Sequence, residues 1–210
     1  MLTIIATLSL LCLPVKASVV YSFKHIAEEC DGPIEIADGQ IGEEQLLVEV
    51  ADHFANQVLF TFTNTGPQPC SITDIYFDDG ELLSMASIDN SCQGVLFSPL
   101  ATPHNLPGGN SLSPPFETTE GFSADSDSPV EHNGINPDEW LGITFALQPG
   151  STYNNVIHSL NTGQLRVGIH VQGFASCGSE SFVNVPEPAT LTILGLGLAA
   201  FLRFPKRKSA

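Results

Sequence analysis

The chain has 210 residues, with 23 Asp and Glu against seven Lys and Arg, and a formal net charge of −16 at pH 7. Five of the basic residues lie near the two ends of the chain, at position 16 and within 203–208. Segment 18–184 holds 22 acidic residues and only two basic ones, Lys24 and Arg166, so its formal charge is −20. Such a surface repels phosphates, which excludes DNA or RNA binding as a function.

The first segment, Met1–Pro14, is almost entirely apolar and is followed by Val15-Lys16-Ala17. A short apolar run followed by a small residue is typical of a secretory signal peptide. We therefore predict a signal peptide at residues 1–17, which signal peptidase cleaves between Ala17 and Ser18. The alternative is an N-terminal membrane helix, which the short run and Pro14 disfavour. No Lys or Arg precedes the run, so the starting amine must supply the positive charge.

Residues 18–184 form an acidic body that is long enough for one domain with a sizeable core. Apolar residues alternate with polar ones at a period of two, most clearly at Val58, Phe60 and Phe62. The expected strands are 45–51, 58–64, 71–77, 81–88, 94–97, 140–147, 164–172 and 181–185. Turns containing Gly and Pro separate them, a pattern that favours a mainly β fold, an antiparallel β-sandwich.

One short helix interrupts the strands. Between residues 153 and 160 the apolar side chains fall at positions i, i+3, i+4 and i+7. Ser151 or Thr152 can cap the start of this helix, and Asn161 and Gly163 can end it. We expect the helix to pack on the sandwich or to close one end of it.

Segment 99–138 is rich in Pro, Gly, Ser and Asn and is long for a connection. Its closely spaced carboxylates are the oxygen ligands that calcium takes in proteins. The candidate calcium ligands are Asp125, Asp127, Glu131 and Asp138. The EF-hand pattern is absent, and the alternative is a solvated acidic loop in which Asp and Asn side chains cap turns.

Cysteine usage agrees with export. Cys12 is lost with the signal peptide, and an even number of cysteines remains for an oxidising compartment: Cys30, Cys70, Cys92 and Cys177. No Cys-x-x-Cys pair is present, which disfavours a zinc ribbon or a thioredoxin-like site. Of the three possible pairings we favour Cys70–Cys92 with Cys30–Cys177, and free buried thiols are the alternative.

Signatures of catalysis are missing from the sequence. It has no Gly-x-Ser-x-Gly elbow, no His-Glu-x-x-His and no glycine-rich phosphate loop, and its six histidines are dispersed. We expect a protein that is not an enzyme and has no cofactor except calcium. Glycosidase carboxylates are paired in space rather than in sequence, so a hydrolase stays as a third interpretation. Trp140, the only tryptophan, heads an apolar strand and is expected in the core rather than on a sugar-binding surface.

The last segment, 185–210, has three parts in order: Pro186-Glu187-Pro188, an apolar run over 189–202, and a basic end over 203–208. The two prolines resist helix and leave an extended segment. Residues 189–204 supply 16 positions for a single transmembrane helix, which is short but tolerable because Arg203 can reach the interface. The basic end favours the cytoplasmic side. The alternative is a buried core helix.

This order resembles the PEP-CTERM sorting signal of Gram-negative bacteria. The resemblance implies that exosortase, a membrane-embedded enzyme similar to cysteine transpeptidases, processes the chain at Pro186, Glu187 and Pro188. It implies an exported protein that passes through an inner-membrane intermediate and then resides on the cell surface or in the extracellular polysaccharide matrix. The body is then a structural or interaction component of the matrix, with a carbohydrate-binding module as the alternative.

Overall fold

The computed structural model describes residues 17–28, 31–54, 56–79 and 83–185. Ten strands, all paired with antiparallel neighbours, form one sheet in the order β5-β8-β3-β2-β1-β10-β9-β4-β7-β6. The strands are β1 (Ser18–His25), β2 (Leu46–His53), β3 (Gln57–Asn64), β4 (Ser71–Asp79), β5 (Leu83–Asp89), β6 (Phe97–Pro99), β7 (Ser123–Ser126), β8 (Trp140–Leu147), β9 (Leu165–Gln172) and β10 (Glu180–Asn184). The helices are α1 (Pro33–Gln45), α2 (Val130–Asn133) and α3 (Tyr153–Thr162), with a 3₁₀ turn at Gly109–Ser111.

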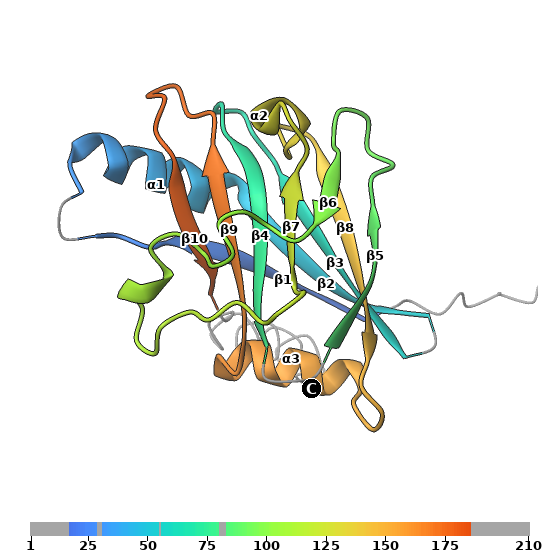
Figure 1. The fold of residues 1–210 in the computed structure, drawn as a ribbon. Coiled ribbons are helices and arrows are strands. Elements are labelled where there is room, and N and C mark those ends of the chain that lie inside the picture. Colours follow the sequence, from blue (N-terminus) through green and yellow to red (C-terminus); the bar gives the residue numbers. More distant parts are fainter. Residues whose placement is uncertain (1–16, 29–30, 55, 80–82, 186–210) are drawn as a thin grey trace, which may run out of the picture.

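The sheet folds over on itself, so that its two halves face each other across a shared core (Figure 1). Strand β1 joins the halves, because residues 18–22 pair with β2 while residues 23–25 pair with β10. The expected sandwich of two separate sheets is therefore wrong, although the mainly antiparallel β character is confirmed. One continuous sheet curls round the core, since a single twisted strand contributes to both halves.

Aromatic side chains fill the space between the two halves. Phe77 of β4 meets Phe60 and Phe145 of the opposite half edge to face, with ring centroids 5.2 and 4.7 Å apart. Phe122 packs on Phe145 from the loop before β7. A second, smaller cluster lies on the outer face of β4 and β9, where Leu106 and other residues of the loop between β6 and β7 cover the sheet.

Helix α3 confirms the helix that the sequence predicts. Thr152 accepts a hydrogen bond from the backbone N–H of Asn155, and Gly163 ends the helix in the left-handed conformation (φ 74°). Val156 and Leu160 are buried in the main core. The helix crosses one end of the curled sheet and closes it (Figure 1).

Helix α1 contradicts the expectation of a single helix. Its 13 residues pack on β1 and β10 through glycine rather than through an apolar stripe. A Cβ atom on Gly42 would lie 2.2 Å from Cζ of Phe182, so the helix approaches the sheet more closely than any side chain allows. Its apolar Ile34 and Ile36 are exposed instead.

None of the helices in the described segments is long and apolar enough to cross a membrane. The transmembrane helix predicted at 189–204 lies outside these segments.

Candidate functional site

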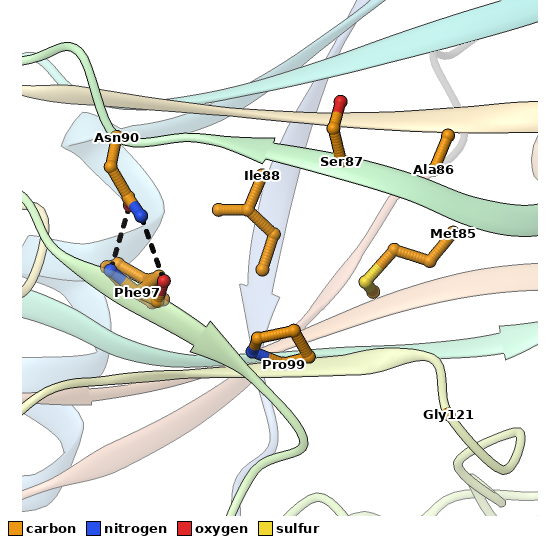
Figure 2. Close-up of a pocket in the computed structure, with 8 residues that line it drawn as sticks. All are labelled: Met85, Ala86, Ser87, Ile88, Asn90, Phe97, Pro99 and Gly121. Carbon is orange, nitrogen blue, oxygen red and sulfur yellow. Dashed lines mark hydrogen bonds between the residues drawn. The ribbon is translucent and has the colours of Figure 1, made fainter.

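A groove of about 450 Å³ lies where the two edge strands of the sheet, β5 and β6, approach each other (Figure 2). At one end the side-chain amide of Asn90 bridges the strands. Its Nδ2 donates to the Phe97 carbonyl and its Oδ1 accepts from the Phe97 N–H, both at 2.9 Å. Met85, Ile88 and Pro99 line the rest, and no lining residue is charged. This groove can bind an extended or apolar group, but it offers no acid or base.

A row of polar residues crosses the outer face of the other half of the sheet. Ser181, His170, Asp74, Asp125 and Ser98 are successive partners in register on β10, β9, β4, β7 and β6. No short-range pattern in the sequence brings these residues together, because β4 pairs with β9 and β7, neither of which is next to it along the chain. The row is therefore a feature of the sheet order.

The two aspartates at the centre of the row form a carboxyl pair. Asp74 is 3% exposed and accepts a hydrogen bond from Thr73 Oγ1 at 2.9 Å. Burial, opposed by the hydrogen bond from Thr73 and assisted by the neighbouring Asp125 carboxylate, raises the pKa of Asp74 to about 7. Burial also raises the pKa of Asp125. The interaction between the two carboxyl groups raises the pKa of Asp74 and lowers that of Asp125, so Asp74 is the member of the pair that holds a proton more readily.

At the other end of the row, His170 Nδ1 lies 3.0 Å from Ser181 Oγ. Burial lowers the pKa of His170, so the ring is neutral at pH 7. A nucleophilic serine needs such a base and a third group that orients it. The nearest candidate for that role in the register, Asp74, bonds to Thr73 and Asp125 instead. The pair is therefore a polar contact between β9 and β10 and lacks the arrangement of a catalytic triad.

Beside His170 and Ser181 opens a pocket of about 220 Å³ that is rich in carboxylates. Its acidic lining residues are Glu28, Asp31, Glu35 and Glu180. Glu180 Oε2 lies 2.7 Å from His25 Nε2, and burial raises the pKa of Glu180 against the effect of that contact. Within the described segments no three His, Cys, Asp or Glu residues are grouped so that they could hold a metal ion.

The four predicted calcium ligands are distributed over different elements. Asp125 lies on β7 in the carboxyl pair, and Asp127 follows the strand and accepts from Ser98 Oγ at 2.8 Å. Glu131 lies on α2, and Asp138 precedes β8 in the left-handed conformation (φ 69°). The structure gives two of the four carboxylates other partners, and calcium binding by this segment stays a prediction.

The predicted disulfide between Cys70 and Cys92 is wrong, because both residues are free thiols in the structure. Cys70 is buried, and its Sγ accepts hydrogen bonds from Gln45 Nε2 at 3.0 Å and Asn64 Nδ2 at 3.6 Å. These amides satisfy the sulfur without a bridge. Burial raises the pKa of Cys70 to about 11, so the thiol stays protonated. Cys177 is an exposed free thiol, and its predicted partner Cys30 lies outside the described residues.

Trp140 does not enter the core, contrary to expectation. Leu141, Ile143 and Phe145 of β8 point into the core, so Trp140 falls on the outer face with Gly142 and Thr144. It is half-buried there, opposite Thr63 of β3. This placement was not predicted because Trp140 stands directly before an apolar run. The core-facing positions of that run begin at the next residue, Leu141.

The ordered fold reaches both predicted processing sites. The carbonyl of Ala17 accepts a hydrogen bond from the Asp52 N–H at 2.9 Å, and Ser18 begins β1. At the other end, the N–H of Val185 donates to the Ser22 carbonyl at 2.9 Å, so the sheet extends to the residue before Pro186. Pro186, Glu187 and Pro188 themselves lie outside the described residues.

Comparison with protein families gives one match. Residues 184–208 match the model of the PEP-CTERM protein-sorting motif. No curated protein and no solved structure matches the chain. The chain thus carries the PEP-CTERM protein-sorting motif that its sequence predicts, and this motif indicates an exported protein that is sorted by exosortase.

Proposed function

We propose that the chain is a surface or matrix protein whose tail anchors it in the membrane until exosortase cleaves at Pro186–Pro188. In this proposal the signal peptide is removed after Ala17, and the released body acts as a structural or interaction component rather than as an enzyme. The observation that carries the proposal is the sorting motif at residues 184–208.

Two further observations support it. The body is strongly acidic, which suits a protein that must stay soluble outside the cell. The sheet runs to Val185, so the motif follows the folded body without a spacer. A processing enzyme that grips an extended Pro-Glu-Pro segment would therefore release the body as an intact domain.

Intact mass of the protein recovered from the surface of a host with exosortase tests both ends. We expect a chain that begins at Ser18 and lacks the residues beyond the motif. Replacing Pro186, Glu187 and Pro188 with alanine should leave the protein in the membrane fraction. A matched control changes Thr190 and Thr192 to alanine, which leaves the motif and the apolar run intact and should not affect release. Mature surface protein that retains residues 189–210 would refute the sorting proposal.

A carbohydrate-binding role is the second candidate, and the position of Trp140 favours it. The indole lies half-buried on an outer sheet face, opposite Thr63 and beside Gly142, whose other neighbour is Asp89 of β5. Aromatic rings with an apolar body and a polar edge are suited to polar surfaces of this kind. Titration of the body with the host's own exopolysaccharide should quench Trp140 fluorescence if this role holds. Because both variants lack tryptophan, binding of Trp140→Phe and Trp140→Ala is measured by co-sedimentation with the polysaccharide, and we expect it to be retained in the first and lost in the second.

A further inference from the structure

The two ends of the described fold leave the molecule along the same pair of strands. Strand β1 begins at Ser18. Strand β10 runs antiparallel to β1, and Val185, the residue after it, lies beside Ser22. Four residues of strand separate the two points, a distance of about 13 Å at the usual rise per residue. Ala17 and Val185, the described residues next to the predicted processing sites, therefore lie toward the same end of β1.

Helix α3 lies between these two exits. At its start, Tyr153 Oη donates to the carbonyl of Val50, whose partner on β1 is Val19. At its other end, Asn161 Oδ1 accepts from Tyr21 Oη at 3.1 Å. The last turn of the helix also shares a pocket of about 180 Å³ with Asn184, the last residue of β10. The helix thus borders the place where each end of the chain leaves the fold.

The outward face of α3 is uncharged, in contrast to the rest of the body. No Asp or Glu occurs from Trp140 to Ser179, and the one Lys or Arg in that stretch, Arg166, is paired with Asp78. The exposed residues of the helix are Asn154, Asn155, His158, Asn161 and Thr162. Asp52 and Glu49 lie near its start, where burial, followed by the charges of these two residues, raises the pKa of Tyr153. Helix α1, by contrast, carries four carboxylates.

We propose that the α3 end of the body faces the membrane surface for as long as the tail is uncleaved. This inference rests on the proposed anchoring by the tail. The β1–β10 ladder holds Val185 beside α3. Only the three residues Pro186–Pro188 separate Val185 from the apolar run that begins at Ala189. A linker of three residues limits which face of the body can turn to the lipid. The exposed face of α3 itself carries no carboxylate, so it adds no charge repulsion against anionic headgroups.

The test uses the full-length chain, purified from a host without exosortase and reconstituted in vesicles of phosphatidylethanolamine and phosphatidylglycerol. The lipid includes a headgroup nitroxide, which quenches a fluorophore only at close range. The fluorophore is attached at Asn154→Cys on α3 or, as the matched control, at His132→Cys on α2 at the opposite end of the sheet (Figure 1). Both positions are exposed, and the background replaces Cys30, Cys92 and Cys177 with serine.

We expect the label at position 154 to be quenched several-fold more strongly than the label at position 132. Residues 18–185 without the tail should show no quenching at either position. Equal quenching at both positions, stronger quenching at 132, or none at either position in vesicle-bound protein would overturn the proposed orientation. If the full-length chain does not float with the vesicles, the anchoring itself is refuted, and the orientation with it.

Discussion

The carboxyl pair of Asp74 and Asp125 lowers the stability of the body at neutral pH, and one substitution should restore it. Asp74→Asn keeps the shape of the side chain. The amide oxygen can still accept from Thr73 Oγ1, and the amide nitrogen can donate to Asp125. The variant therefore retains both hydrogen bonds without burying a second carboxyl group that must hold a proton.

The size of the effect follows from the raised pKa. Asp74 titrates near pH 7 in the folded body, against its ordinary 3.8, and each pKa unit corresponds to about 1.4 kcal/mol. Since the folded state keeps a proton that the unfolded state releases, the wild-type protein loses stability as pH rises from about 4 to about 7 and regains none above that. The full penalty is on the order of 4 kcal/mol at pH 8, and it vanishes below pH 4.

Urea unfolding of the body at pH 4, 6 and 8 and fixed ionic strength measures this penalty. Asp74→Asn should be more stable than wild type by a few kcal/mol at pH 8, with a nearly equal free energy of unfolding at pH 4. Asp127→Asn, two residues beyond Asp125, is the control and should change stability by less than about 0.5 kcal/mol. A variant that is less stable than wild type at pH 8, or that keeps the wild-type pH dependence, would show that Asp74 does not hold a proton in the folded body near neutral pH.

Two other predictions follow from close packing and from thiol chemistry. Gly42→Ala should cost about 1–3 kcal/mol in thermal or urea unfolding because its Cβ meets Phe182, whereas Gln40→Ala on the exposed face of α1 should be nearly neutral. With a thiol reagent at pH 8, Cys177 should react in the native body while Cys70 reacts only after unfolding, because Cys70 is buried and has a raised pKa. A mass showing two disulfides would contradict the thiol prediction.

Period-two alternation in the sequence predicted most strands well. The pattern of Val58, Phe60 and Phe62 gave β3, and the expected strand 140–147 is β8 without change. Helix α3 was equally clear, because it buries an apolar stripe and has both caps. Helix α1 was missed because its buried residues are Asp38, Gly39, Gly42 and Gln45, which form no apolar stripe in the sequence.

The candidate site features were mostly beyond prediction from the sequence. The sorting motif could be predicted because its signal is contiguous in the chain. The pairing of Asp74 with Asp125 depends on which strands become neighbours, and five of the nine links in the sheet order join strands that are not consecutive in sequence. The contact of His170 with Ser181 depends on the register between β9 and β10. The even number of cysteines predicted disulfides, but it could not show that the side-chain amides of Gln45 and Asn64 donate hydrogen bonds to the Cys70 thiol.

The two hydrogen bonds between Asn90 and Phe97 affect whether copies of the protein can pair through their sheet edges at high concentration. Open strand edges with unpaired N–H and C=O groups are templates on which other chains add strands and aggregate. Curling brings both edges of this sheet, β5 and β6, to one place, and the amide of Asn90 occupies two of the backbone groups there. Strand β6 is only three residues long and ends at Pro99, which has no N–H to offer. These features shorten the open edge of β6 on which a second copy of the body could add a strand.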